Sequence, residues 1–539
     1  MIRNRRLRKG AAALILAGLT LLCAWACADT AADITSACSF NAGSGRKTFS
    51  QCKDRNYKTY WKTNNGPKCF VEVTVPGGQT ASGVMVQWYE HPHAWGVQLQ
   101  DEDGNWTDAG HTEGSFLAEY LPLPEGTTHF RVANAPGESR HFNMAELRIY
   151  GAGETPPEAQ QWQPCAEKAD LMLLVAHPDD EVLWFGGTLP TYAGERGLAC
   201  QVCMMVPSMP YRRLELLDSL WTCGVRNYPA FGNFRDAFSY SLTKQYKHWS
   251  KNHVYDVVTG WIRRFQPDVL LTQDLQGEYG HGGHRVCADA VMHCVEYAAN
   301  AEKYPDSAKE YGIWDTPKCY IHLWSEQVID MDGRQPLAAF GGKTSFEVAE
   351  EAFYCHVSQR KTDYHVEDWG PCDNSLFGLY RSLVGPDEEK NDFFEKYEMY
   401  SLIRKTDETE KKEDRKAHIV NKISSSLLNE AMICFVSDEF SYYQRKIRGA
   451  AFAINGRQEY IRLEDLKKDE DALAYLNSDK KKIVFDLKAV KHALDYNGIA
   501  ISGNCDDIYL MCFLSNNYNS DLKAIIMNYV GGQIKDLKE

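Results

Sequence analysis

The chain has 539 residues, which is too many for a single hydrophobic core, so we expect about three domains. Its hydrophobic content of 44% and charged content of 24% are those of an ordinary globular protein. The formal net charge of −14 argues against a broad nucleic-acid-binding surface, because such surfaces are basic.

The first 28 residues have the pattern of a targeting segment. A basic stretch at residues 3–9 precedes an apolar run from Ala11 to Ala26, and Ala26-Cys27-Ala28 fits a small-residue cleavage site. We therefore expect residues 1–28 to be a cleaved signal peptide and the mature protein to be secreted or held in the cell envelope. An uncleaved anchor is the alternative, although the apolar run is short for a membrane span. No second run of that length follows, so we expect no membrane span in the mature chain.

Residues 29–152 contain short runs of alternating polar and apolar residues, separated by turn residues. This pattern predicts an all-β sandwich. The segment also resembles the discoidin-like (coagulation factor 5/8 type C) domains, through Asp54, Thr59-Tyr60-Trp61 and the closing run 146–151. The resemblance implies a glycan-binding surface built from loop aromatics, although large aromatics in alternating strands are more often core. The candidate side chains for such a platform are Trp88, Tyr89, His91, His93, Trp95 and Trp106.

The next part of the chain alternates strands with helices. Residues 151–164 are rich in proline and glutamine and predict a linker. Residues 165–395 then predict an α/β domain with a mostly parallel sheet and helices on both faces. The predicted strands are 171–176, 199–206 and 268–272, and the predicted helices are 182–196, 212–223, 253–265 and 284–298.

Two polar segments follow strands of this predicted sheet. His177-Pro-Asp-Asp-Glu181 comes directly after strand 171–176, and Glu278-Tyr-Gly-His-Gly-Gly-His284 follows strand 268–272. Ligands of such sheets bind beyond the carboxyl ends of the strands, so we expect both segments at one site. Each motif alone has a plainer explanation, as a turn or as a surface histidine pair. Their joint occurrence at strand ends of one domain favours a functional site.

The residue types at this site predict metal-assisted hydrolysis of an amide. His177, Asp180 and His284 can supply three ligands to one Zn²⁺ ion and leave a position for water, although other divalent ions accept the same ligands. Asp179 is the candidate general base for that water. His281 is the candidate proton donor to the leaving amine or stabiliser of the oxyanion. Tyr279 can add a hydrogen bond to the oxyanion.

Ala176–Glu181 together with the downstream Tyr-Gly-His-x-x-His resembles the PIG-L (LmbE-like) de-N-acetylases, over about residues 168–395. The resemblance implies a Rossmann-like fold and zinc-dependent removal of an acetyl group from an N-acetylglucosamine-type sugar, with the ligand and base roles given above. It also implies that Arg212 contacts the substrate and that Asp236 holds a sugar hydroxyl.

The sequence departs from this family pattern between the two downstream histidines. Gly282-Gly283 stands where the family often has Pro-Asp. The spacing of the histidines is kept, but a carboxylate that could support His284 is lost.

Two more polar residues are candidates for the substrate cleft. Lys343 and His356 lie near or on a helix that Thr344 and Glu347 would cap. The alternative is that they belong to a solvated helix face.

Residues 396–539 predict a small α/β domain, with strands at 431–436 and 449–454 and helices at 486–496 and 506–514. This segment resembles the 3′–5′ exonuclease-like domain of family A DNA polymerases at 447–451, 485–488 and 507–514. The early acidic pair of that domain is absent, which leaves Asp507 without carboxylate partners. A two-metal nuclease needs several carboxylates, so we expect a degenerate domain without nuclease activity. Either a genuine fusion or a chimeric gene accounts for its presence.

The leading hypothesis is therefore an exported zinc-dependent N-deacetylase acting on an N-acetylated sugar or glycan, with a β-sandwich that attaches it to glycans. The alternative is a non-catalytic glycan-binding protein whose deacetylase domain has decayed. A DNA-processing role rests on the C-terminal segment alone, and the acidic charge opposes it.

Overall fold

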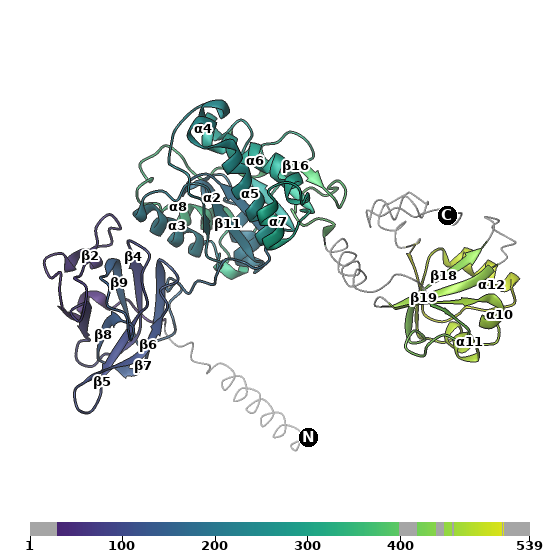
Figure 1. Cartoon of the computed structure of the whole chain (residues 1–539), viewed down its shortest axis with the longest axis horizontal. Coiled ribbons are helices and arrows are strands. Elements are labelled where there is room, and N and C mark those ends of the chain that lie inside the picture. The colour runs from purple at the N-terminus through teal and green to yellow at the C-terminus, as the bar shows by residue number, and fades with distance from the viewer. Residues whose placement is uncertain (1–29, 398–417, 438–446, 455–456, 509, 511–539) are drawn as a thin grey trace, which may run out of the picture. The chain divides into compact units, whose positions relative to one another are not determined.

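The computed structural model describes residues 30–397, 418–437, 447–454, 457–508 and 510 (Figure 1). The predicted signal peptide lies outside these residues. The chain divides into two compact units, Met1–Arg381 and Ser382–Glu539, so the division falls before the predicted boundary at 395/396. No helix among the described residues is long and apolar enough to cross a membrane.

The first part of the N-terminal unit consists of two antiparallel sheets (Figure 1). In β3, for example, Val71 and Val73 are buried while Glu72 between them is not, which is the alternation expected of a strand with one covered face. In spatial order, the five-stranded sheet contains β1 (Ser39–Ala42), β3 (Phe70–Thr74), β8 (His129–Asn134), β5 (Trp95–Gln100) and β6 (Trp106–Thr112), and the four-stranded sheet contains β2 (Trp61–Lys62), β9 (Asn143–Gly151), β4 (Ala81–Trp88) and β7 (Ala118–Thr127). Two short 3₁₀ helices accompany them, η1 (Thr35–Ala37) and η2 (Phe49–Lys53).

Two of the aromatic residues predicted as a glycan platform belong to the interior. Trp88 is 1% exposed and Trp95 is fully buried, and their rings lie 5.4 Å apart, with one on each sheet. An indole on the covered face of a strand stabilises the core by removing a large apolar area from water. These two tryptophans therefore cannot form an exposed platform.

The second part of this unit is an α/β layer structure with a seven-stranded, mostly parallel sheet. Strand β10 pairs in parallel with β11 on one side and with β13 on the other, as the sequence predicts, whereas β15 and β16 pair antiparallel. The order across the sheet is β12 (Ala230–Phe231), β11 (Cys200–Met204), β10 (Leu171–Val175), β13 (Val269–Thr272), β14 (Lys318–His322), β16 (Leu376–Ser382) and β15 (Val328–Asp330).

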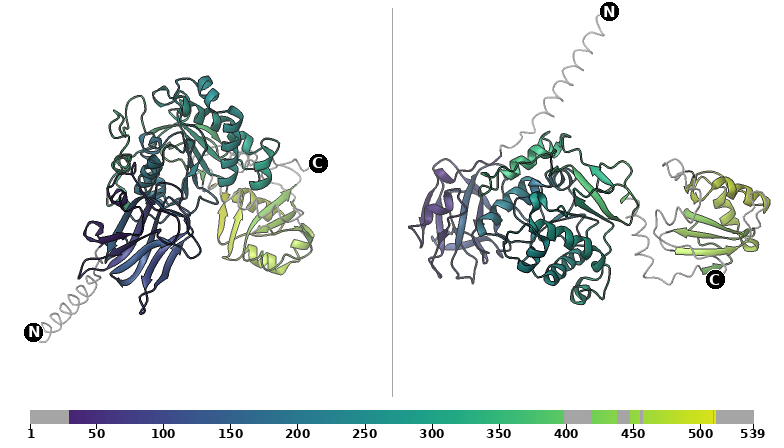
Figure 2. Two further views of the ribbon diagram at one scale, coloured as in Figure 1. Left: turned by 60° about the vertical axis from the view of Figure 1, so that its left-hand side comes forward. Right: turned by 90° about the horizontal axis from the view of Figure 1, so that it is seen from above.

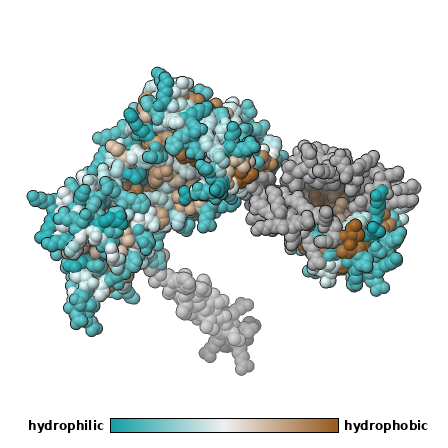
Figure 3. All heavy atoms as spheres, in the orientation of Figure 1, coloured by the Kyte–Doolittle hydropathy of each residue, from teal (hydrophilic) through white to brown (hydrophobic). Residues whose placement is uncertain are grey.

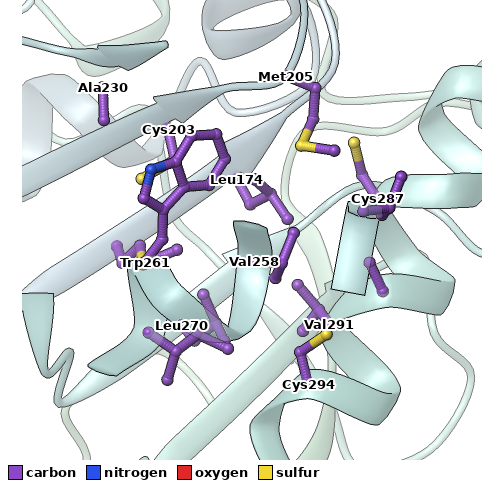
Figure 4. Close-up of a cluster of buried hydrophobic side chains, with 14 of the residues drawn as sticks. Leu174, Cys203, Met205, Ala230, Val258, Trp261, Leu270, Cys287, Val291 and Cys294 are labelled. Carbon is purple, nitrogen blue, oxygen red and sulfur yellow. The ribbon is translucent and has the colours of Figure 1, made fainter. Parts of the chain in front are cut away.

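Helices cover both faces of this sheet (Figure 2). Successive side chains of a strand face opposite sides, and every residue of β10 is therefore buried. One face packs on α5 (Lys251–Phe265) and α6 (Gly282–Ala298), where Leu174 lies among residues such as Val258 and Val291 (Figure 4). In a second group of helices, α8 (Ser345–Phe353) contacts both α2 (Asp180–Leu183) and α3 (Pro210–Thr222). The remaining helices of this part are α4 (Leu242–His248), α7 (Pro305–Tyr311), η4 (Glu278–Gly280) and η5 (Ala338–Phe340).

The predicted helix over residues 182–196 is present but interrupted. Helix α2 ends at Leu183, residues 184–187 form a turn, and helical structure resumes at Thr188 and continues through the π-helical η3 (Pro190–Glu195). Gly186 lies in this turn, where a Cβ atom would lie 2.6 Å from Val366 Cγ1, which leaves no room for a side chain. Pro190 favours the break, since proline lacks the N–H that would continue the first helix. The other three predicted helices of this part are present, with slightly different ends.

The second unit contains a six-stranded mixed sheet with its own core. Leu427, Phe452 and Leu476 are fully buried in that core. The predicted helix over 506–514 is wrong at its start, where Cys505–Asp507 form strand β22, and most of its remainder lies outside the described residues. The sheet order is β17 (His418–Val420), β20 (Arg457–Arg462), β19 (Ile447–Ile454), β18 (Glu430–Ser437), β21 (Lys481–Val484) and β22, and the described helices are α10 (Leu463–Leu466), α11 (Glu470–Leu476) and α12 (Leu487–Tyr496).

The N-terminal unit is held together by a polar cluster around Asp218 of α3. Its carboxylate accepts hydrogen bonds from Tyr57 Oη at 2.5 Å, Gln87 Nε2 at 2.8 Å and Gln160 Nε2 at 2.6 Å. Tyr57 and Gln87 belong to the two-sheet part, so this carboxylate ties that part to the α/β part. On the face shown in Figure 3, the surface of the two-sheet part is largely hydrophilic.

Replacing Asp218 with alanine should lower the free energy of unfolding of this unit by about 3 kcal/mol, because several buried donors lose their acceptor. All 13 tryptophans lie in residues 1–381, so tryptophan fluorescence during urea denaturation reports this unit alone. The exposed Asp103→Ala change is the control and should shift stability by at most about 0.5 kcal/mol. Equal effects of the two changes would contradict the assigned role of Asp218.

Candidate metal and catalytic site

The two polar segments meet at one edge of the parallel sheet. His177 follows β10, and the loop after β13 runs through η4 to the start of α6. Because β10 and β13 are parallel neighbours, their carboxyl ends lie side by side. The side-chain Oε1 of Gln273 accepts a hydrogen bond from Ala176 N at 3.0 Å and joins the two strand ends directly.

The three predicted metal ligands lie together around the Asp180 carboxylate. Oδ2 accepts a hydrogen bond from the backbone N–H of His177 at 2.7 Å and lies 3.4 Å from His177 Nδ1. Oδ1 lies 3.2 Å from His284 Nε2 and accepts a hydrogen bond from Trp184 Nε1 at 3.0 Å. All three predicted ligands are buried.

The unsatisfied atoms of this cluster fit a divalent cation. Within the described part of the chain, His177 Nε2 and His284 Nε2 are buried nitrogens that form no hydrogen bond. The 3.2 Å contact between His284 and Asp180 is an ion-pair distance without hydrogen-bond geometry. Buried polar atoms are rarely left without a partner. Two imidazoles and a carboxylate are a common ligand set for Zn²⁺, and other divalent ions use it as well.

His281 completes a group of three imidazoles, whose potential ligand atoms lie within 4.8 Å of those of His177 and His284. Its Nδ1 accepts a hydrogen bond from the backbone N–H of Gly283 at 3.0 Å, which caps α6. The proton of the neutral ring is therefore on Nε2. Burial, followed by the neighbouring His177 and His284, lowers the pKa of His281 to about 3. His281 is thus a neutral hydrogen-bond donor beside the predicted ligands.

Asp179 is held in a strained conformation next to the ligands. Its φ angle of 115° is in the left-handed region, and its backbone N–H donates to Glu181 Oε2 at 2.8 Å. Its carboxylate lies 3.1 Å from Arg212 Nη2, and the same guanidinium donates to the carbonyl of Pro178. Burial raises the pKa of Asp179 to about 7, against the opposing effect of Arg212. A carboxylate with this pKa can accept a proton near neutral pH.

Tyr279 lies at the mouth of the site. It is 40% exposed, its φ angle is 45°, and its ring centre is 5.3 Å from that of His284 and 5.6 Å from that of His281. Together with Trp184 and Tyr364 it lines a cleft of about 510 Å³. None of the three clustered histidines lines this cleft, but the ring centres of Tyr279 and Trp184 in its wall lie 5.3 and 6.5 Å from that of His284.

The predicted substrate residues are dispersed. Arg212 contacts Asp179, as described above, and Asp236 is an exposed residue of the loop before α4. Lys343 forms an ion pair at 2.7 Å with Glu351 on an exposed side of α8. His356 is fully buried, and its Nε2 lies 2.7 Å from Glu181 Oε1. In contrast to the prediction, His356 therefore supports Glu181 and does not face the cleft.

The expected loss of support for His284 does not occur. Glu278 Oε2 lies 2.8 Å from His284 Nδ1, and Glu278 Oε1 lies 2.6 Å from His322 Nδ1. Although burial by itself raises it, hydrogen bonds from these two histidines hold the pKa of Glu278 at about 2. The sequence motif Glu278–His284 already contains Glu278. Its contact with His322 at the end of β14 depends on the order of the strands, which the sequence does not show.

Comparisons with known proteins agree with this geometry. Residues 172–295 match the family model described as GlcNAc-PI de-N-acetylase, PIG-L. A 1D-myo-inositol 2-acetamido-2-deoxy-alpha-D-glucopyranoside deacetylase of Nocardioides sp. is 30% identical over 213 residues, which is 33% of this chain and 69% of that protein. The corresponding deacetylase 1 of Catenulispora acidiphila is 28% identical over 232 residues, covering 37% of this chain and 68% of its own.

The chain belongs to the PIG-L family of deacetylases. Among solved structures, it is similar to the N,N'-diacetylchitobiose deacetylase from Pyrococcus horikoshii, with 20% identity and a TM-score of 0.28 over 35% of this chain and 71% of that one. It is also similar to the conserved protein TT1542 from Thermus thermophilus, with 18% identity and a TM-score of 0.26 over 35% of this chain and 80% of that one.

The C-terminal segment has a different relationship. Residues 433–536 match the ribonuclease H-like domain of DNA polymerase I, as its resemblance to exonuclease domains implied. The Asp507 carboxylate accepts hydrogen bonds from the backbone N–H groups of Asp486 at 3.0 Å and Leu487 at 2.9 Å. Among the described residues of the second unit, the Asp507 side chain therefore contacts the start of α12.

Adding Zn²⁺ to the metal-free PIG-L protein should raise its melting temperature, because the cation binds the folded site only. At 100 times the dissociation constant, such binding stabilises the fold by about 2.7 kcal/mol. His284→Ala should abolish the shift in differential scanning calorimetry. His293→Ala, a change on the same helix at a side chain that is 44% exposed, should preserve it. A shift that survives His284→Ala would place the metal elsewhere.

Proposed function

We propose that the protein is a zinc-dependent hydrolase that removes the acetyl group from an N-acetylglucosamine-type sugar or glycan. The observation that carries this proposal is the pair of buried, unsatisfied nitrogens, His177 Nε2 and His284 Nε2, beside the strained Asp179. Candidate metal ligands and a candidate base thus lie together beyond the carboxyl ends of the neighbouring strands β10 and β13. Membership of a deacetylase family supports the reaction type.

His177, Asp180 and His284 would hold the zinc ion. When bound, the ion polarises the amide carbonyl and lowers the pKa of water to about 7. The Asp179 carboxylate accepts a proton from the attacking water, and Arg212 fixes the orientation of that carboxylate. As the C–N bond breaks, the protonated Asp179 gives this proton to the leaving amine, which restores the carboxylate. The neutral His281 donates a hydrogen bond through Nε2 to the developing oxyanion, and Tyr279 adds a second donor from the mouth of the cleft.

The substrate class follows from the relatives. The deacetylases of Nocardioides sp. and Catenulispora acidiphila are named for a 2-acetamido-2-deoxyglucoside of inositol. The cleft beside Tyr279, at about 510 Å³, offers space for such a sugar and for a further group. We therefore propose N-acetylated glucosaminides as substrates.

Asp179→Asn should reduce acetate release by about 10²- to 10⁴-fold, because the amide cannot accept the proton, while zinc content stays near one ion per chain. The assay measures free acetate from N-acetylglucosamine, N,N'-diacetylchitobiose and the inositol glucosaminide, and zinc is measured by elemental analysis. Asp306→Asn on an exposed helix is the control and should match the wild type. If the wild type binds zinc but releases no acetate from any of these sugars, the decayed, non-catalytic alternative replaces the proposal.

We further propose that the protein is exported and that its two-sheet part binds glycans. Export rests on the pattern of residues 1–28. Glycan binding is supported by a cleft of about 170 Å³ whose polar side chains suit sugar hydroxyls. The residues that line it are Glu90, His91, Pro92, His93, His141, Phe142 and Asn143, with the buried ring of Trp88 beneath them.

The double change His91→Ala/His93→Ala in the full chain should abolish retention on a glycan array, because two polar side chains of this cleft are lost. Acetate release from free N-acetylglucosamine should not change, since the cleft is separate from the histidine cluster. Unchanged retention on the array would rule out this cleft as the glycan site.

A further inference from the structure

A buried hydrogen-bonded chain runs behind the metal-ligand candidate His284. The Glu278 carboxylate contacts His284 Nδ1 at 2.8 Å with one oxygen and His322 Nδ1 at 2.6 Å with the other. His322 Nε2 in turn lies 2.8 Å from the carbonyl oxygen of Asp373. Glu278 is 1% exposed, and His284 and His322 are fully buried.

The partners of each nitrogen determine where the protons lie. A carbonyl oxygen only accepts, so His322 Nε2 carries a hydrogen that it donates to Asp373. His284 Nδ1 faces a carboxylate and donates to it, so Nε2, the unsatisfied atom beside Asp180, is the nitrogen that presents a lone pair when the ring is neutral. The carboxylate therefore selects the tautomer of His284 that can bind a cation.

His322 offsets the electrostatic cost of burying the Glu278 carboxylate. An isolated carboxylate with no exposed surface is strongly destabilising unless a donor or a cation pairs with it. A proton is held between His322 Nδ1 and Glu278 Oε1 at 2.6 Å, and Asp274 N donates to the same oxygen at 3.0 Å. His322 thus stabilises the Glu278 carboxylate, and this carboxylate in turn orients the ring of His284.

The glycines between the downstream histidines explain why the carboxylate comes from Glu278. A Cβ atom on Gly283 would lie 3.1 Å from both His177 Cε1 and His281 Nδ1. On Gly282 it would lie 2.2 Å from Ser239 Oγ. A side chain at either position would require its neighbours to move, so the support for His284 has to come from another part of the loop.

We propose that Glu278 and His322 are positioning residues that fix the ring orientation and tautomer of His284 and replace the carboxylate missing from Gly282-Gly283. This inference rests on the proposed metal-dependent function, because it assigns His284 to the metal. Carboxylates behind metal-binding histidines typically change metal affinity by about 10- to 100-fold when they are removed.

The test is the zinc dissociation constant of full-length variants, measured by competition with a chelator. Glu278→Gln and His322→Phe should each weaken zinc binding by about 10- to 100-fold. The double variant should lose less than the product of the two single effects, because both act through one ring. In the cobalt-loaded protein, both changes should also shift the visible absorption bands, which report the ligand geometry.

Glu146→Gln is the matched control, since it makes the same change at another buried glutamate, in β9. Burial raises the pKa of Glu146 to about 8, so its carboxyl group is largely neutral near pH 7 and glutamine resembles it. This variant should bind zinc as the wild type does. If Glu278→Gln does not fold, the milder His322→Gln, which does not touch His284, provides the same measurement.

A folded Glu278→Gln or His322→Gln variant with wild-type zinc affinity and an unchanged cobalt spectrum would overturn the positioning roles. That outcome leaves the deacetylase proposal intact. Conversely, a wild-type protein that binds zinc but releases no acetate contradicts the proposed function, while weaker zinc binding by the variants still supports the positioning roles. The two failures are therefore distinguishable.

Discussion

The buried carboxylate of Asp180 is the interaction on which the site depends. It is 2% exposed and receives hydrogen bonds from the backbone of His177 and from the indole of Trp184. Burial alone lowers the pKa of His284, but Asp180 and Glu278 raise it to about 10, so in the metal-free protein His284 holds a proton between two carboxylates. A divalent cation would compensate the negative charge of these carboxylates with a larger positive charge than the proton does. Its binding requires the proton on His284 Nε2 to leave.

Two glutamate–histidine pairs keep this arrangement rigid from behind. Glu278 with His322 supports the ligand candidate, whereas Glu181 with His356 supports the base. Glu181 accepts hydrogen bonds from Ser219 Oγ and from the backbone of Asp179, and so holds the strained turn. Removing one member of such a pair leaves an uncompensated buried charge, which is far more costly than the pair is stabilising. The positions of the candidate metal ligands and of the candidate base are thus fixed by separate, fully buried networks.

Much of this site could be predicted because it lies in short segments next to strands. The apolar run before His177 indicates a buried parallel strand, and the carboxyl end of such a strand is where ligands bind. The single helix predicted over 182–196 misses the break at 184–187, because periodicity outweighs the local effect of Gly186 and Pro190. Trp88 and Trp95 are candidates for both a platform and the core from sequence, because alternation alone does not tell which face of a strand is covered. The supporting residues could not be predicted, since their partners are distant in sequence and meet only through the order of the strands. His322 is the last residue of β14, which pairs with β13. Because Glu278 lies in the loop that follows β13, this pairing brings the two side chains into contact.

The glycine pair at 282–283 shows why a missing motif residue is weak grounds for predicting a lost function. In this chain a Cβ atom at position 283 would lie only 3.1 Å from both His177 Cε1 and His281 Nδ1, and Gly283 avoids these close contacts. Gly282 allows its N–H to reach the carbonyl of Ser239 at 2.6 Å, which brings that loop onto the start of α6. The local sequence therefore favours close packing of the histidines over a carboxylate in the same turn. Because Glu278 precedes the turn, its carboxylate can orient His284 without occupying that space.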